Sequence, residues 1–173
     1  PLATLTAAPP VKRRPNIVMI LTDDQGYGDL GCYGAKDLRT PVTDRLADQG
    51  VRFTQYYAAA PECSPTRTAL LTGRYLQRVG GLECAIGVGN VGRYDDAIRL
   101  AGRHDLGLPS DLATLPRALK AAGYATAVYG KWHLGYEEKF RPSRCGFDQF
   151  VGVLGGNCEI GRASCRERVY LCV

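Results

Sequence analysis

The sequence lacks the features of several specialised protein classes. No apolar run approaches the ~20 residues that a membrane-spanning helix needs. The seven cysteines form no Cys-x-x-Cys pair and no Cys/His cluster of the kind that binds zinc. The sequence also lacks a concentrated block of positive or negative charge. Its formal net charge is +5, and the charged residues are scattered along the chain. That balance favours an anionic substrate only weakly and does not predict nucleic acid binding. With 45% hydrophobic and 23% charged residues among 173, the composition is that of a globular protein.

The two ends of the chain differ from its middle. Residues 1–15 are rich in small residues and proline and then turn basic. We interpret them as a leader or linker at the end of a removed signal peptide, which predicts a secreted or periplasmic protein. Residues 159–173 begin with a stretch without apolar periodicity, and one DNA string that encodes residues 159–169 resembles a short-read sequencing adapter read in frame. We therefore expect residues 159–173 to be foreign and residues 16–158 to belong to the natural domain.

The middle of the chain alternates strand and helix signals. Apolar, β-branched runs predict strands at Ile17–Leu21, Val51–Tyr57 and Tyr124–Gly130. Proline near the start and glycine at the end predict three helices, which run from Thr40 to Gly50, from an N-cap at Ser64 to Gly73, and from Thr114 to Gly123. This alternation predicts an α/β fold with a mixed or parallel sheet flanked by helices, in which sites gather at the carboxyl ends of the strands.

A long Gly-rich segment, Val79–Asp111, interrupts this pattern and predicts a loop or an insertion of short elements. Within it, residues 87–92 fit the Gly-x-Gly-x-x-Gly pattern of dinucleotide-binding loops. That motif requires a strand before it and a helix after it, and both neighbours are poor candidates. Dinucleotide binding is therefore kept as a remote alternative. We interpret His104 as a solvated loop residue.

Cys63 lies in the sequence Glu-Cys-Ser-Pro-Thr-Arg at the first turn of a predicted helix. Free backbone N–H groups at a helix start lower the pKa of a thiol. Arg67 follows one turn later, so it can pair with an anion there. A thiolate phosphatase would need five residues between cysteine and arginine, and only three are present. A buried structural cysteine would explain the thiol but not Pro65 and Arg67.

Two further groups of charged residues lie at strand ends. Asp23 and Asp24 directly follow the first strand, where charge is costly unless it has a role, and paired carboxylates suit Ca²⁺ or Mg²⁺. Lys131 and His133 leave the third strand two residues apart, so in an extended segment they would point to the same side. A cation and an imidazole together suit the holding of an anion and the transfer of protons.

Three stretches resemble the type I sulfatase family: NIVMILTDDQGYGDLGCYG, CSPTRTALLTGR and GYATAVYGKWHLG. The later stretch FRPSRCGFDQFVGVLGG is also similar to sulfatases of the arylsulfatase A type, and the resemblance covers roughly Pro15 to Asn157. It implies an alkaline phosphatase-like fold, of which this chain is the N-terminal part. It also implies that a formylglycine-generating enzyme oxidises Cys63 to formylglycine. One hydroxyl of the hydrated aldehyde attacks the sulfur of a sulfate ester, and the other then expels the sulfate, which a serine could not do.

The resemblance also assigns roles to individual residues. It implies that Asp23, Asp24 and the modified Cys63 bind Ca²⁺, or Mg²⁺ in its place, and that Arg67 steadies the formylglycine. Lys131 and His133 would contact the sulfate or the aldehyde hydrate. Glu62 and Thr66 are less usual neighbours of the cysteine signature. The expected partners are an aryl or carbohydrate sulfate ester and the formylglycine-generating enzyme.

The same resemblance implies that further residues are needed. The family takes an Asp-Asn metal pair, a second histidine and a second lysine from further along the chain, and nothing after Asn157 here supplies them. We therefore expect the 173-residue chain to bind metal poorly and to turn over little substrate. Two alternatives stay open, a phosphonate or phosphate monoester hydrolase of the same superfamily and a non-catalytic fragment. The sequence does not identify the natural sulfate ester.

Overall fold

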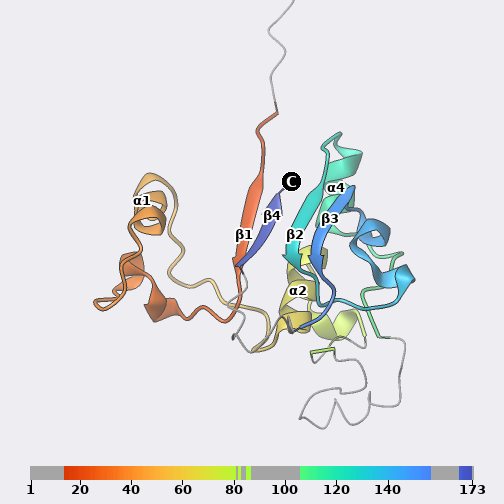
Figure 1. The fold of residues 1–173 in the computed structure, drawn as a ribbon, viewed down its shortest axis with the longest axis horizontal. Helices are drawn as coiled ribbons and strands as arrows, with labels where there is room; N and C mark the ends of the chain where they lie inside the picture. The colour runs from red at the N-terminus through yellow and green to blue at the C-terminus, as the bar shows by residue number, and fades with distance from the viewer. Residues whose placement is uncertain (1–13, 81, 83–84, 87–105, 157–167, 173) are drawn as a thin grey trace, which may run out of the picture.

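The structure is a computed structural model that describes residues 14–80, 82, 85–86, 106–156 and 168–172. A single four-stranded sheet forms its centre, in the order β1-β4-β2-β3 (Figure 1). The strands are β1 (Val18–Thr22), β2 (Ala127–Lys131), β3 (Gln149–Val153) and β4 (Arg168–Cys172). No helix within the described residues is long and apolar enough to cross a membrane.

The sheet is mixed rather than purely parallel. Strands β2 and β3 are parallel, with Ala127 opposite Gln149, whereas β4 runs antiparallel to both of its neighbours, β1 and β2. The first and third predicted strands are confirmed as β1 and β2, each shifted by one to three residues. Strand β4 lies in the segment that we interpret as a foreign tail. Residues 159–167 of that segment lie outside the described residues, as do the Gly-x-Gly-x-x-Gly segment at 87–92 and His104.

Three helices are described, and all three predicted helices are present. They are α1 (Pro41–Gln49), α2 (Cys63–Thr72) and α4 (Leu115–Ala121). Helix α1 begins with proline after Thr40 and ends at Gly50, as the sequence predicts. Helix α2 ends at Gly73, whose φ of 64° is the left-handed conformation that glycine adopts readily. Short 3₁₀ turns supply much of the remaining backbone, at Tyr27–Asp29, Gly31–Tyr33, Leu76–Arg78, Glu138–Phe140 and Pro142–Cys145.

The hydrophobic core lies between α2, β2 and the turns that follow β2 and precede β3. Leu134 and Leu82 are fully buried there, and the Trp132 and Phe147 rings meet edge to face at a centroid distance of 6.2 Å. The other buried members of this cluster are Leu71, Ile86, Leu106, Leu108, Val128 and Cys145. The position of this core beside α2 and β2 holds the start of α2 against the end of β2.

Helix α1 stands apart from this core (Figure 1). Its apolar side chains Val42 and Leu46 are exposed, and the helix contributes no buried residue. The predicted strand Val51–Tyr57 is wrong, because this segment follows α1 without strand pairing and its side chains are exposed. A strand needs a neighbour to hydrogen-bond with, and no described strand lies against this segment.

The predicted N-terminus of α2 is also corrected. Helix α2 begins at Cys63 and its N-cap is Glu62, which has extended backbone angles, so the expected cap at Ser64 is wrong. The Ser64 oxygen accepts a hydrogen bond from the Ile86 amide at 3.0 Å instead of from an amide of α2, and its hydroxyl donates to the backbone carbonyl of His133 at 2.8 Å. Cys63 is therefore the first helical residue, whereas a cap at Ser64 would have placed it two positions earlier, outside the helix.

Candidate active site

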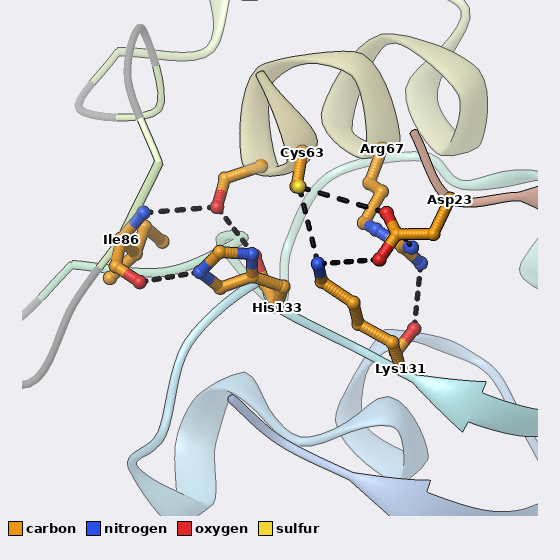
Figure 2. Close-up of polar contacts among 7 residues, drawn as sticks. Asp23, Cys63, Arg67, Ile86, Lys131 and His133 are labelled. Atoms are coloured by element: carbon orange, nitrogen blue, oxygen red, sulfur yellow. Dashed lines mark hydrogen bonds and ion pairs between the residues drawn. The ribbon is translucent and has the colours of Figure 1, made fainter. Parts of the chain in front are cut away.

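The start of α2 and the ends of two strands bring the predicted site residues together. Asp23 directly follows β1, Cys63 opens α2, and Lys131 is the last residue of β2. These three side chains meet in the cluster that Figure 2 shows. They are far apart in the sequence, so the arrangement depends on the packing of α2 against β2 and on the place of β1 in the sheet.

Lys131 connects the other two members of the cluster. Its Nζ atom lies 2.9 Å from Asp23 Oδ2 and 3.2 Å from Cys63 Sγ. The Cys63 Sγ atom lies 3.8 Å from Asp23 Oδ1, which closes the triangle. The Lys131 side chain is only 4% exposed. A buried ammonium group in contact with the cysteine side chain places positive charge beside the thiol, where it would stabilise an anion.

Arg67 adds a second cation to this cluster. One of its terminal nitrogens lies 3.5 Å from Asp23 Oδ1, and the other donates to the backbone carbonyl of Lys131 at 2.7 Å. Arg67 therefore joins α2 to the end of β2 as well as to the carboxylate. The sequence prediction that it lies one helical turn beyond Cys63 and faces the same site agrees with this placement.

The charges of this cluster change the proton affinity of its members. Burial alone would raise the pKa of Asp23, but its hydrogen bond with Lys131 and the positive charges of Lys131 and Arg67 hold that pKa below its usual value. Burial alone would lower the pKa of Lys131, and its contacts with Asp23 and Cys63 outweigh that effect and raise it. The pair is therefore ionised near neutral pH, as a carboxylate and an ammonium group.

Asp23, Asp24 and Cys63 also form a possible metal site. Each offers one ligand atom, and these atoms lie within 4.8 Å of one another. Asp24 has a left-handed backbone, with a φ of 53°, and an exposed side chain. The two carboxylates are hard oxygen donors that suit Ca²⁺ or Mg²⁺, while a thiol does not, so the set fits such an ion when an oxygen replaces the sulfur of Cys63. An open pocket of about 610 Å³ lies over this group.

His133 occupies a different part of the site. Its ring nitrogen Nε2 lies 2.6 Å from the backbone carbonyl of Ile86, and the side chain is buried. Burial is the main cause that lowers the pKa of His133, and the charges of Lys131 and Arg67 lower it further, so the ring is neutral near pH 7. The expectation that Lys131 and His133 lie in one extended segment, with their side chains on the same side, is wrong in its premise, because His133 has a left-handed φ of 54°.

Sequence reasoning missed two residues of this arrangement, Ser64 and Ile86. Ser64 was interpreted as a helix cap, and Ile86 lies in a segment without a clear pattern. Ser64 is fully buried and bonds to His133, and the Ile86 amide donates to the Ser64 hydroxyl at 3.0 Å. The sequence signal for Ser64 was its position directly after Cys63. A serine at that position can either cap the helix or bond to another segment, and the sequence does not distinguish the two.

Comparison with known proteins identifies the family. The sulfatase family model matches residues 15–164. The chain belongs to the sulfatase family. The chain is 49% identical to steryl-sulfatase of Mus musculus over 152 residues, which are 84% of this chain and 23% of that protein. It is 42% identical to N-acetylgalactosamine-6-sulfatase of Sus scrofa over 164 residues, which are 95% of this chain and 29% of that protein.

Solved sulfatase-like structures support the fold. The crystal structure of Ps i-CgsB is similar with a TM-score of 0.71 and 37% sequence identity, over 83% of this chain and 29% of that chain. These findings confirm the predicted resemblance to sulfatases and the α/β fold, for which the sequence left a mixed or a parallel sheet open. The chain spans about a quarter of the length of the curated sulfatases that it matches, 23% and 29% in these two cases.

Proposed function

We propose that the protein containing this chain hydrolyses sulfate monoesters, with Cys63 converted to formylglycine as its nucleophile. The observation that carries the proposal is the contact between Cys63 Sγ and the buried ammonium group of Lys131, 3.2 Å away, at the first residue of a helix. A buried cation and a helix start together favour an anion at this position. The family membership of the chain supplies the reaction type.

The residues of the site support each part of this reaction. Lys131 and Arg67 provide positive charge for the sulfate group and for the charge that develops during attack. A hydroxyl of the formylglycine hydrate at position 63 forms the bond to sulfur, and the ester oxygen leaves as the alcohol. The second hydroxyl then gives up its proton, the carbon–oxygen bond to the sulfate breaks, and the aldehyde returns. The neutral ring of His133 is suited to accept a proton near this position.

We propose further that Asp23, Asp24 and the modified residue 63 hold a divalent cation, Ca²⁺ or alternatively Mg²⁺. Such an ion would supply Lewis-acid charge that neutralises the ester. Ca²⁺ takes about 6–8 oxygen ligands, whereas the cluster in the described part of the chain offers three residues. The proposal therefore includes weak metal binding and little turnover by the 173-residue chain itself. Detectable aryl sulfate hydrolysis by that purified chain would contradict this part.

The proposed partners follow from the same chemistry. The substrate is a sulfate ester of an aryl or carbohydrate alcohol, and the formylglycine-generating enzyme acts on Cys63. The names of the relatives include steryl-sulfatase and N-acetylgalactosamine-6-sulfatase, so members of the family differ in the alcohol whose sulfate ester they act on. Secretion or export to the periplasm stays a prediction from the composition of residues 1–15.

The experiment that tests the proposed function compares two substrates with one leaving group. A chain extended to the length of its relatives is co-expressed with the formylglycine-generating enzyme and assayed with an aryl sulfate and an aryl phosphate. We expect faster turnover of the sulfate and complete loss in Cys63→Ala. Faster turnover of the phosphate would instead favour a phosphate monoester hydrolase. Equal activity in Cys63→Ala would contradict the role of the nucleophile.

A further inference from the structure

Ala85 and Ile86 are hydrogen-bonded to the two residues on either side of Cys63 in the sequence. The Glu62 carboxylate accepts a hydrogen bond from the Ala85 amide at 2.5 Å, and the Ser64 hydroxyl accepts one from the Ile86 amide at 3.0 Å. Ser64 is fully buried, so its bond with the Ile86 amide is made away from competing water, while the bond of Glu62 is half-buried. The two residues that flank Cys63 therefore fix the position of the Ile86 peptide.

The same serine also fixes the backbone of His133. Its hydroxyl donates to the His133 carbonyl at 2.8 Å, while the His133 amide donates to the Leu154 carbonyl at 3.0 Å. Both backbone groups of His133 are thus bonded, which offsets the cost of its left-handed conformation, with a φ of 54°. Ser64 uses its donor and its acceptor to hold the two segments that meet at the imidazole.

The imidazole lies between these two segments (Figure 2). Nε2 is 2.6 Å from the Ile86 carbonyl, and a carbonyl can only accept, so Nε2 carries the proton. Nδ1 is buried and has no hydrogen-bond partner among the residues that the structure describes. A Cβ atom on Gly156 would lie 2.4 Å from His133 Cε1, so the ring packs directly against that glycine and has little room to turn. The ring orientation therefore depends on where the Ile86 carbonyl is held.

We propose that Ser64 is a positioning residue that fixes the Nε2-protonated form of His133 and leaves Nδ1 as a buried proton acceptor. Ser64 acts through Ile86, whose amide it binds and whose carbonyl orients the ring, and it also holds the His133 backbone. The use of Nδ1 in catalysis rests on the proposed function, but the proton position does not. The role of Ser64 is thus to couple the residue next to the nucleophile with the base.

The proton position can be measured directly because the chain has only two histidines, His104 and His133. The chain is labelled with ¹⁵N in the histidine rings, and His104→Gln identifies the His133 signals. We expect a protonated Nε2 and an unprotonated Nδ1 at neutral pH. In Ser64→Ala the two ring shifts should move toward each other, because the forms interconvert when the Ile86 carbonyl is no longer held. A proton on Nδ1 in the unmodified chain would overturn the proposal.

A matched control separates this effect from a general loss of stability. Thr68 is equally buried on α2, and its hydroxyl donates within the helix to the Ser64 carbonyl, so Thr68→Ala removes a buried helix hydroxyl whose hydrogen bond goes to neither His133 nor Ile86. We expect Thr68→Ala to leave the His133 ring shifts unchanged. Identical ring shifts in Ser64→Ala and Thr68→Ala would contradict the proposal.

Hydrogen exchange of the Ile86 amide gives a second, independent readout. This amide should exchange roughly tenfold faster in Ser64→Ala, because it loses one buried hydrogen bond, and at an unchanged rate in Thr68→Ala. An unchanged rate in both variants would contradict the proposed hold on Ile86. Neither readout depends on sulfate ester turnover, so a failure of this inference and a failure of the proposed function are distinguishable.

Discussion

The surroundings of α2 and of α1 differ although both helices have clear sequence signals. Around α2 and β2, Leu134 is fully buried and Val128 is 2% exposed. Around α1, Leu46 is 60% exposed and Val51, just beyond the helix, is 80% exposed. Local signals such as a starting proline and a closing glycine are enough to set helix ends. Burial, and with it a rigid site, requires partners from other parts of the chain.

This difference explains where the candidate site lies. Its side chains come from α2, from the end of β2 and from the residues just after β1, and the core beside α2 and β2 holds them in place. Helix α1 and residues 51–57 contribute none of its charged groups. Substitutions in the packed part should therefore change stability more than substitutions at exposed positions.

The buried charge cluster should be the most sensitive feature. Replacing Asp23 by Ala leaves the buried cations Lys131 and Arg67 without their carboxylate. Loss of one partner of a buried ion pair costs about 3–5 kcal/mol, so the free energy of unfolding should fall by roughly that amount. Chemical denaturation measures it. Glu138→Gln is the control, because Glu138 pairs with Arg141 at the surface and such pairs contribute about 0–1 kcal/mol. Equal losses in the two variants would contradict the account.

Two leucines test the contrast in packing. Leu134→Ala should cost about 2–5 kcal/mol, since it removes a fully buried side chain and leaves a cavity. Leu46→Ala should change the free energy of unfolding by less than about 0.5 kcal/mol, because that side chain is exposed. The same denaturation series compares them. A large cost for Leu46→Ala would mean that α1 is packed in solution and would break the contrast.

The reactivity of two free cysteines provides a chemical comparison of the packed core and the surroundings of α1. Cys145 is fully buried, and burial raises the pKa of its thiol to about 11, whereas Cys32, near α1, is half-buried. Alkylation requires an accessible thiolate. We therefore expect iodoacetamide at pH 8 to modify Cys32 at least about tenfold faster than Cys145. Peptide mass spectrometry after timed quenching measures both rates. Equal rates in the folded chain would show that the core around Cys145 opens readily.

The smallest effect concerns a surface carboxylate beside the sheet. A hydrogen bond from Lys120, and further ones from Thr126, lower the pKa of Asp148 from 3.8 to about 2. A lowered folded-state pKa stabilises the fold above the unfolded value, and this stabilisation is lost as the pH falls from about 4 to 2. Asp148→Asn should therefore flatten the decline in stability over that range. Denaturation at a series of acidic pH values checks this, and an unchanged decline would contradict it.

Much of the fold was predictable where the signals are local. The helix ends at Pro41 and Gly73 follow from the conformations that proline and glycine prefer. The strand expected at residues 51–57 was wrong because strand formation depends on a distant neighbour that composition does not reveal. The mixed character of the sheet depends likewise on β4, whose antiparallel pairing no local pattern predicts.

The candidate site was predictable to a similar extent. Motif spacing identified Asp23, Cys63, Arg67 and Lys131, and the structure brings these four together. The place of His133 was not predictable, because its left-handed backbone and its bond to Ile86 arise from tertiary contacts. The double role of the Ser64 hydroxyl was hidden for the same reason, since a serine after a cysteine at a helix start resembles a cap.

The most direct test of the central claim is the chemical state of residue 63. The chain is co-expressed with the formylglycine-generating enzyme and digested with trypsin, and the peptide Phe53–Arg67 is analysed by mass spectrometry. Arg67→Ala, which alters the signature, is the control, and in that variant a longer peptide carries residue 63. The account predicts an aldehyde at position 63 in the unaltered chain and a thiol in the variant. An unmodified Cys63 in the unaltered chain would contradict the formylglycine nucleophile on which the proposed sulfatase reaction depends.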